Sequence, residues 1–300
     1  LNKFMKIFDC FMYFDEDILL DIRLNILWDK VDYFVIVESK YNHKGEPRDL
    51  NFDIKKFDKF KSKIIYIIHD LIPENIEKVL NKDDEGTKSK KEIFNAYKRE
   101  NSQRNFIEKG LSKAGRDDII MISDLDEIPN LKNVNLKNLK EKIILFKQKM
   151  FYYKLNLQAS NINWVGTKVC KKKFLKSPQW LRDIKDRKYD FYRLDTFFSQ
   201  NKYIDVKIIE NGGWHFTNLK TPEQIKLKLA SYLHHREFDI NPLTTNEISQ
   251  IIERKKAIYN LSVDKKNQKF GEGETLNKVD LEKLPDYIIY NKEKFGEWLD

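Results

Sequence analysis

Three carboxylates follow a strand-like apolar run within four positions of the chain. Residues 119–129 read IIMISDLDEIP, so Asp124, Asp126 and Glu127 come soon after the run. On an extended backbone Asp124 and Asp126 would point to one side and Leu125 to the other. Two carboxylates on one side suit magnesium or manganese, which binds one or two protein carboxylates and completes its shell with water and substrate phosphate. The alternative is a polar turn in contact with water, and the motif alone does not decide between the two.

A second polar cluster lies on the helical segment that precedes this strand. Residues 100–106 read ENSQRNF and include Arg104 and Asn105. An arginine at this place can make a forked contact with a phosphate or a carboxylate. The alternative interpretation is a surface arginine paired with Glu100 or Glu108, each four residues away.

A third cluster, residues 210–216, reads ENGGWHF and joins two glycines to a tryptophan and a histidine. Gly212 and Gly213 permit a turn or the close approach of a ligand. Trp214 offers a flat apolar face of the kind that stacks on sugar rings, and His215 can bind a metal ion or donate to a phosphate. A histidine beside a tryptophan is also common as a packed structural residue, so both interpretations stay open.

Strand-like and helical patterns alternate in the first half of the chain. Apolar strands are predicted at residues 5–14, 32–38, 64–69 and 118–123. After residue 15, apolar residues recur at helical spacing, which predicts a helix there. A long polar helix is predicted over residues 90–113, and a loop is predicted at residues 83–91. Continuous apolar strands separated by helices indicate an α/β fold with a Rossmann-like, mainly parallel central sheet flanked by helices. Ligands bind beyond the carboxyl ends of such strands, where residues 124–127 and Glu38 lie.

The second half of the chain has a different pattern. Longer, partly alternating strands are predicted at residues 143–157 and 167–175, and helices at residues 221–238 and 244–261. We therefore expect a mixed-strand half followed by C-terminal helices.

The composition indicates a folded, basic protein. Of its 300 residues 41% are hydrophobic, and the formal net charge is +9. This charge favours an anionic partner such as a nucleotide, an acidic glycan, nucleic acid or a membrane surface, without ranking them. The two cysteines, Cys10 and Cys170, form no C-x-x-C pair, which argues against a disulfide scaffold or a thiolate metal site. No signal peptide or membrane span is visible, so we expect a cytoplasmic protein, at most peripheral to a membrane through its basic surface.

Taken in order, several segments resemble glycosyltransferase family 17. They are MKIFDCFMYFDE, DYFVIVES, NSQRN, IIMISDLDEIP and GGWHF, and the resemblance spans residues 5–240. It implies a GT-A type fold in one continuous domain, in which residues 1–130 bind the nucleotide-sugar donor and residues 131–300 form the acceptor-binding half and the C-terminal helices. It also implies an inverting transfer that uses manganese or magnesium and a UDP-sugar, typically UDP-GlcNAc.

The resemblance assigns metal-site roles to residues of this sequence. Asp124 and Asp126 match the metal-binding D-x-D motif of the family. Glu127 matches the acid that follows the motif, and His215 matches a histidine that is a candidate third metal or diphosphate contact.

The resemblance also implies contacts with the donor. Arg104 and Asn105 match a segment expected to face the donor. Glu38 matches the acid that closes the second strand, near the nucleotide base or ribose. Trp214 is expected to form an apolar wall for a sugar.

Sugar transfer to a hydroxyl group requires a carboxylate that takes the hydroxyl proton. Asp126 is expected to take part in catalysis through the metal ion. The sequence does not single out the base, and the candidates are Glu127, Asp183, Asp186, Asp195 and Glu210.

Animal members of the family carry a membrane anchor and a stem that this sequence does not show, so the resemblance implies a microbial or viral member. The expected acceptor is a glycan, a lipid-linked glycan or a glycoprotein. One alternative is a metal-dependent phosphoryl-transfer enzyme or nuclease, for which the positive charge would suit a nucleic-acid backbone. Another is a glycan-binding protein without activity. The ordered motifs favour the transferase, so no nucleic-acid partner is expected.

Overall fold

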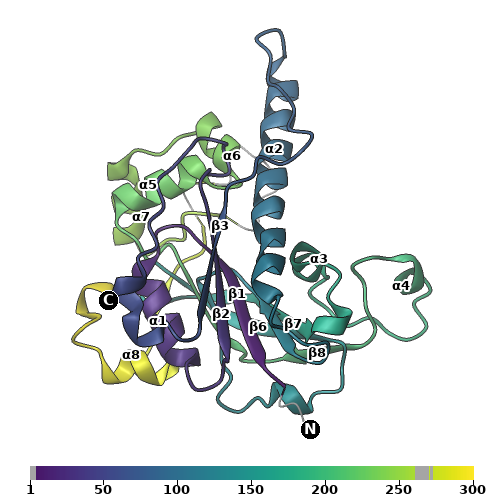
Figure 1. Ribbon diagram of the computed structural model, residues 1–300. Coiled ribbons are helices and arrows are strands. Elements are labelled where there is room, and N and C mark those ends of the chain that lie inside the picture. The colour runs from purple at the N-terminus through teal and green to yellow at the C-terminus, as the bar shows by residue number, and fades with distance from the viewer. Residues whose placement is uncertain (1–4, 261–269, 271–272) are drawn as a thin grey trace.

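The computed structural model describes residues 5–260, 270 and 273–300, in which helices cover a single mixed β-sheet (Figure 1). The strands are β1 (Ile7–Tyr13), β2 (Tyr33–Ser39), β3 (Ile64–His69), β4 (Ile119–Ile122), β5 (Glu127–Pro129), β6 (Ile143–Tyr152), β7 (Leu157–Lys171), β8 (Val206–Ile209), β9 (Gly213–Thr217) and β10 (Asn277–Lys278). The helices are α1 (Asp17–Leu27), α2 (Glu85–Asn105), α3 (Pro178–Asp183), α4 (Asp195–Phe198), α5 (Pro222–Ser231), α6 (His235–Ile240), α7 (Thr245–Glu253) and α8 (Asp286–Tyr290). Within the described residues, no helix is both long and apolar enough to cross a membrane.

The sheet has a parallel half and a mixed half. Its strand order is β3-β2-β1-β4-β7-β6-β9-β5, and β8 and β10 pair with β6 and β7. β1 to β4 pair in parallel, whereas β7 runs antiparallel to both β4 and β6. A short connection joins β6 to β7, as antiparallel neighbours allow. The mixed-strand second half is therefore confirmed, whereas a mainly parallel sheet is not. Parallel pairing joins β1 to β4 and also joins β6 to β8 and β9, but β7 is antiparallel to both of its neighbours β4 and β6.

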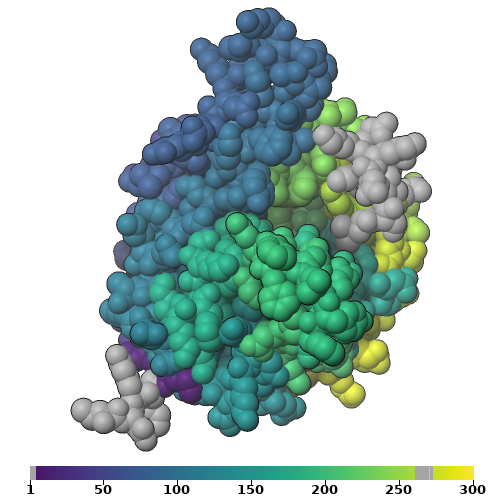
Figure 2. Space-filling model, turned by 90° about the vertical axis from the view of Figure 1, so that its right-hand side faces the viewer, coloured from purple at the N-terminus to yellow at the C-terminus, as the bar shows by residue number. Residues whose placement is uncertain are grey.

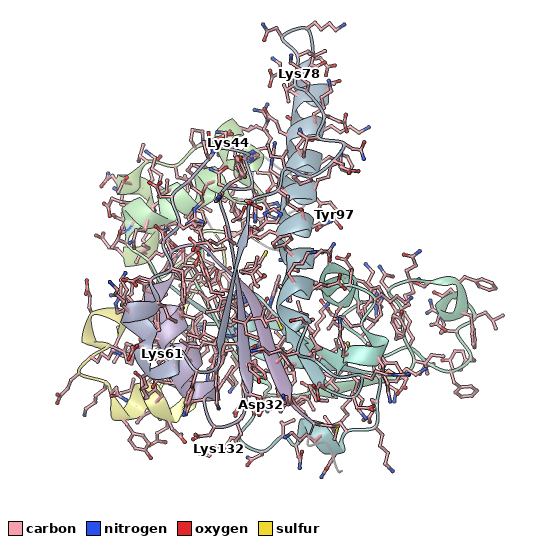
Figure 3. All side chains as sticks on the ribbon, in the orientation of Figure 1. Asp32, Lys44, Lys61, Lys78, Tyr97 and Lys132 are labelled. Carbon is pink, nitrogen blue, oxygen red and sulfur yellow. The ribbon has the colours of Figure 1, made fainter. Side chains whose placement is uncertain are left out.

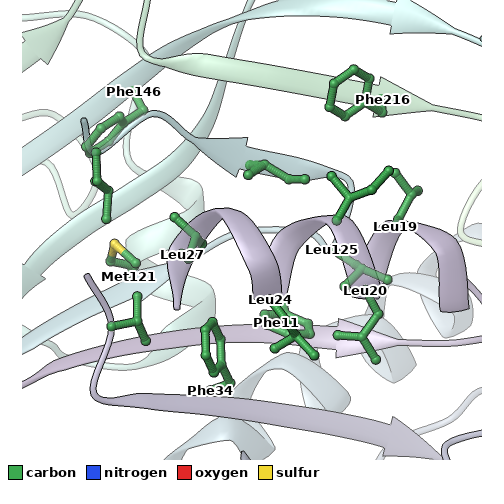
Figure 4. Packing of buried hydrophobic residues seen from close by; sticks show 14 of the residues in the cluster. Phe11, Leu19, Leu20, Leu24, Leu27, Phe34, Met121, Leu125, Phe146 and Phe216 are labelled. Carbon is green, nitrogen blue, oxygen red and sulfur yellow. The ribbon is translucent and has the colours of Figure 1, made fainter. Parts of the chain in front are cut away.

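The parallel strands are almost wholly apolar because both of their faces are covered. On one face Leu24 and Leu27 of α1 lie in the same buried cluster as Phe11 of β1 and Phe34 of β2 (Figure 4). On the other face a second cluster includes buried residues of the 3₁₀ turn Phe106–Leu111, which follows α2. This packing holds the carboxyl ends of β1, β2 and β4 side by side.

Two predicted helix boundaries are wrong. The loop predicted at residues 83–91 contains the first turns of α2, because the Asp84 side chain accepts a hydrogen bond from the Thr87 backbone amide at 3.0 Å and caps the helix. The helix predicted over residues 221–238 is divided into α5 and α6. A capping box at Thr221 starts α5, and the chain leaves the helical conformation for three residues before α6 begins.

The remaining sequence expectations concern the C-terminal part and the cysteines. α7 ends before the end of the helix predicted over residues 244–261, and residue 261 lies outside the described residues. Cys10 and Cys170 are both buried free thiols, which confirms that they form no disulfide.

Two segments project from the body of the molecule. The N-terminal part of α2 and the chain before it extend beyond the sheet, with Lys78 near the outer end and Tyr97 nearer the body (Figure 3). The segment around α4 stands away from the sheet at another side (Figure 1). Both projections lie in connections between strands, where added residues do not disturb the sheet.

Candidate active site

The carboxylates after β4 lie in a tight turn. The Glu127 backbone amide donates to the Asp124 carbonyl at 3.1 Å, and the Asp124 amide donates to Oε2 of Glu127 at 2.8 Å. The extended backbone predicted for this segment is therefore wrong. Leu125, between the two aspartates, is buried in the core cluster that also holds residues of α1 (Figure 4). Asp124 and Asp126 both line a cavity.

A buried arginine holds this turn in place. Arg23 of α1 donates two hydrogen bonds to Asp9 of β1, from Nε to Oδ2 at 2.8 Å and from Nη2 to Oδ1 at 2.6 Å, and both side chains are inaccessible to solvent. Its Nη1 also donates to the carbonyl oxygens of Asp124, Leu125 and Glu127, at 3.1, 3.1 and 2.9 Å. The charge of Asp9 offsets the charge of Arg23, and the remaining donors go to these carbonyls and to Oγ of Ser123. Arg23 thus fixes the backbone that carries the acids.

Glu127 is saturated by hydrogen bonds inside the protein. Its Oε1 accepts from Nε1 of Trp164 at 2.5 Å and from Nη2 of Arg182 at 2.6 Å, while Oε2 accepts from the Asp124 amide. The side chain is fully buried, and a Cβ on Gly166 would lie 2.8 Å from its carboxyl carbon. Glu127 therefore positions its neighbours in the turn, and both of its oxygens are occupied.

Asp124 lies between two arginines. Its Oδ1 accepts from Nη2 of Arg104 at 3.0 Å and its Oδ2 from Nη2 of Arg182 at 2.9 Å. Burial alone would raise the pKa of Asp124, but Arg182 and Arg104 lower it by more, so the net shift of the pKa is downward. Asp124 is therefore ionised at neutral pH and holds both guanidinium groups beside the cavity.

Arg104 forms the ion pair with Glu100 that its spacing predicts, but it is buried, and a contact with a phosphate stays a prediction. Arg104 pairs with Glu100 at 2.7 Å, as expected for residues four apart on a helix, and the same nitrogen contacts Asp124. It is not a surface residue, since 3% of its side chain is exposed. Its Nη1 also donates to Gln179 of α3 at 2.6 Å, so this arginine links α2, α3 and the turn.

Asp126 has looser partners than Asp124. Nε2 of His215 lies 3.5 Å from its Oδ2 and Nζ of Lys228 lies 4.0 Å from the same oxygen. Burial would raise the pKa of Asp126, but His215 and Lys228 lower it overall. Burial would lower the pKa of His215, but Asp126, Glu127 and Asp124 raise it overall. His215 and Asp126 therefore face each other at 3.5 Å, and each favours the charged form of the other.

Asp126 and His215 together fit a metal ion that takes its remaining ligands from water and substrate. Among the described residues, no group of three or more His, Cys, Asp and Glu side chains is arranged to hold a metal ion. Asp126 and His215 supply two donors at the cavity, and a magnesium-like ion usually leaves its other positions to water and substrate phosphate. His215 must release its proton to bind a metal, so a proton and a metal compete for it. Asp124, also predicted as a ligand, has both oxygens occupied by arginines.

A cavity of about 450 Å³ opens at the carboxyl ends of β1, β2 and β4, where the sequence predicts ligand binding. Its volume lies in the range that holds small ligands and cofactors. Asp124, Asp126 and His215 line it together. Its apolar and aromatic wall includes Met12, Phe14, Tyr152, Trp164, Tyr232 and Tyr259.

Comparison with known proteins adds the family to this geometry. The model of glycosyltransferase family 17 matches residues 1–299. The chain belongs to glycosyltransferase family 17. Curated relatives are the β-1,4-mannosyl-glycoprotein 4-β-N-acetylglucosaminyltransferases of Homo sapiens and Rattus norvegicus, each 27% identical over 229 residues, and that of Mus musculus at 26%. The matched region covers 71% of this chain and 40% of each relative.

Several residues predicted for the donor site of this family 17 protein lie outside the cavity lining. Glu38 is fully buried, and its carboxylate accepts from Arg48, from the amides of residues 51 and 52, and from Tyr66. Asn105 accepts from the Gln179 amide at 2.9 Å. These two side chains hold the loop after β2 and the start of α3, respectively.

Trp214 and the two glycines before it have structural roles in this family 17 protein. Trp214 packs against the main core and donates to the Lys283 carbonyl. Gly213 has a φ of +136°, and a Cβ there would lie 2.1 Å from the Ile128 carbonyl oxygen. Gly213 therefore permits the close approach of β9 to β5, and a Cβ on Gly212 would lie 2.8 Å from the Ile209 carbonyl oxygen of β8.

The predicted acids of the acceptor half also lie away from the cavity. Glu210 pairs with Lys147, and Asp183 accepts from Gln179 at 2.8 Å. Asp186 pairs with Lys168 and Asp195 with Arg193 and Lys202. Within the described part of the chain, the acids that line the cavity are Glu16, Glu100, Asp124 and Asp126.

Sequence reasoning missed Arg23, Trp164, Arg182 and Lys228. The sequence contained a signal for Arg23. It is a charged residue on the apolar face of a helix, Asp9 lies inside an apolar strand, and each of them needs a buried partner. For Arg182 and Lys228 there was no such signal, since both come from distant helices, α3 and α5, and meet the turn only in the folded chain.

Proposed function

We propose that this chain transfers a sugar, N-acetylglucosamine, from a UDP-sugar to a hydroxyl group of a glycan or glycoconjugate, with inversion and with a divalent metal ion. The observation that carries the proposal is the placement of Asp126 and His215 together at a cavity beyond the parallel strands. The proposed sugar follows the names of the relatives. Family membership and this geometry favour sugar transfer over cleavage of nucleic acid.

We further propose that the sheet is of the GT-A type and forms one domain. The turn that carries the acids follows β4 of the parallel half, and the cavity is lined from both residues 1–130 and residues 131–300. Such a cavity allows a donor held by the first half to meet an acceptor held by the second. The acceptor class remains a glycan, a lipid-linked glycan or a glycoprotein.

Asp126 and His215 would hold the metal ion, manganese or magnesium. When bound, the ion would bind donor phosphate oxygens and offset the negative charge that develops on the departing UDP. Arg104, Arg182 and Lys228 bring three further positive charges to the same region, two of them fixed by Asp124. Charges that are fixed before the reaction stabilise developing charge without the cost of reorganisation.

The protein must also bind the sugar and take a proton. Trp164 lines the cavity, and the hydrogen bond from its Nε1 to Glu127 fixes its ring. Trp164 therefore replaces Trp214 as the proposed apolar wall for a sugar. The base must reach the acceptor hydroxyl within the cavity. Glu100 pairs with Arg104, Asp124 pairs with two arginines, and Asp126 is assigned to the metal ion, which leaves Glu16 as the favoured base. Oε2 of Glu16 accepts from the backbone amides of Phe14 and Asp15, and its Oε1 lies 3.9 Å from Nζ of Lys220.

The test is hydrolysis of a panel of nucleotide sugars with manganese, since slow hydrolysis needs no acceptor. We expect UDP-GlcNAc to be cleaved and excess chelator to stop cleavage. Asp126→Asn should lower the rate at least ~100-fold. The matched control is Glu210→Gln, which removes the charge of an acid outside the cavity lining and should leave the rate unchanged. Cleavage that persists in Asp126→Asn or with chelator would contradict the proposal.

A further inference from the structure

Residues 185–202, here called the α4 lobe, carry an exposed aromatic surface. The lobe stands away from the sheet in Figure 1 and lies on the face turned to the viewer in Figure 2. Its large apolar side chains are between 66% and 91% exposed, and they are Phe191, Tyr192, Leu194, Phe197 and Phe198. Soluble proteins rarely gather so many large apolar side chains at one exposed place unless a partner covers them.

A group of cations lies at the base of this aromatic surface. The ring of Tyr189 is buried, and the charged groups of Arg187, Arg193 and Lys202 lie 5.5, 5.7 and 5.9 Å from its centroid. These contacts hold three positive charges at the base of the projecting side chains. Lys185 and Lys188 add two more, so the lobe has five basic and three acidic residues and a net charge of +2.

Part of this positive charge is available to an external partner. Arg193 and Lys202 share Asp195, at 2.8 and 2.7 Å. Within the described residues, no carboxylate forms an ion pair with Lys185, Arg187 or Lys188. These three side chains are exposed and lie close in sequence to the aromatic tip.

The other projection of the molecule differs in charge. Residues 70–98, here called the α2 arm, also carry exposed apolar side chains, among them Leu71 and Ile72. This arm has six basic and seven acidic residues, a net charge of −1. Exposed apolar side chains thus occur on both projections, but only the α4 lobe combines them with an excess of positive charge.

We propose that the α4 lobe docks the protein onto a lipid bilayer that contains anionic headgroups. The aromatic and leucine side chains of residues 191–198 would enter the interface between headgroups and acyl chains, where aromatic rings are favoured. The basic side chains behind them would contact lipid phosphates, each lysine or arginine adding to the attraction. A narrow projecting tip suits insertion among lipids, whereas a protein partner is usually met by a broad surface. The inference does not depend on the reaction proposed for the cavity.

The test is sedimentation of the full chain with vesicles of phosphatidylcholine alone and of phosphatidylcholine with phosphatidylserine. We expect binding to the anionic vesicles, weaker binding at high salt and much weaker binding to the neutral ones. Phe197→Ser with Phe198→Ser should weaken binding ~10-fold or more, because the apolar area that enters the interface is lost. Arg187→Gln with Lys188→Gln should weaken binding to anionic vesicles only.

The matched control is Leu71→Ser with Ile72→Ser on the α2 arm, which should bind vesicles as the unchanged chain does. Absence of binding to anionic vesicles would overturn the proposal, as would equal loss of binding in the control variant. Dimers of the chain that dissociate in the Phe197→Ser, Phe198→Ser variant would also overturn it, because a second copy would then cover the surface. Hydrolysis of UDP-sugars in solution should be the same in this variant and the unchanged chain, which separates this proposal from the reaction.

Discussion

The acids of the turn at residues 124–127 differ in how closely other protein groups contact their carboxylate oxygens. On one side Asp124 and Glu127 accept from arginines, a tryptophan and a backbone amide at 2.5 to 3.0 Å. On the other side, the contacts of the Asp126 carboxylate with charged groups of the described residues are longer, 3.5 Å to His215 and 4.0 Å to Lys228. Short charge-assisted bonds fix a side chain, whereas a longer contact leaves oxygen lone pairs for a ligand. From this comparison we propose that Asp124 and Glu127 position the site and that Asp126 meets the ligand.

The largest expected effect is on stability, and it comes from a change to Arg23, which holds the turn in place. Arg23→Met should lower the free energy of unfolding by ~3–5 kcal/mol, because it leaves the charge of Asp9 buried without a partner. Denaturant unfolding measures this loss. A loss below ~1 kcal/mol would show that water reaches Asp9 and that the pair is not needed for stability.

A double variant separates charge balance from positioning. Arg23→Met with Asp9→Leu replaces the buried pair by apolar side chains and should recover much of the stability. The carbonyls of Asp124, Leu125 and Glu127 would still lack their donor, so hydrolysis of the UDP-sugar should stay at least ~10-fold below that of the unchanged chain. Full activity in the double variant would show that Arg23 only balances the charge of Asp9 and is not needed to position the turn.

The second prediction concerns Glu127. Glu127→Gln keeps the shape of the side chain but removes the charge that pairs with Arg182, and should cost ~1.5–3 kcal/mol in thermal or denaturant unfolding. Glu210→Gln, a change of the same type at an exposed ion pair, should stay within ~0.5 kcal/mol of the unchanged chain. Equal losses in the two variants would remove the distinction between a buried positioning acid and a surface acid.

The sequence predicted the parts of this arrangement that depend on local pattern. The apolar runs of β1 to β4, the placement of the acids after β4 and the link between Arg104 and Glu100 follow from spacing along the chain. The turn at Asp124, the use of Trp164 in place of Trp214 and the arrival of Arg182 depend on contacts between distant segments. The mixed sheet likewise results from the pairing of β4 with β7, which lie far apart in the sequence.

The smallest expected effect on stability distinguishes the two aspartates directly. Asp124→Asn should cost ~1–3 kcal/mol, because it removes the charge that two arginines share, whereas Asp126→Asn should cost ~0.5 kcal/mol or less. The effect on activity should be larger for Asp126→Asn than for Asp124→Asn. Unfolding curves and hydrolysis rates of both variants provide the test, and the reverse order in either measurement would contradict the division of roles.

Calorimetric titration of UDP with manganese and with excess chelator tests the central claim most directly. The unchanged chain should bind UDP tightly only with manganese, and Asp126→Asn should lose this metal-dependent part of the binding while it folds normally. Asp124→Asn should keep a measurable metal-dependent part, since Asp126 and His215 remain. Equal UDP affinity with manganese and with chelator, or unchanged metal-dependent binding in Asp126→Asn, would contradict the assignment of this acid to the ligand.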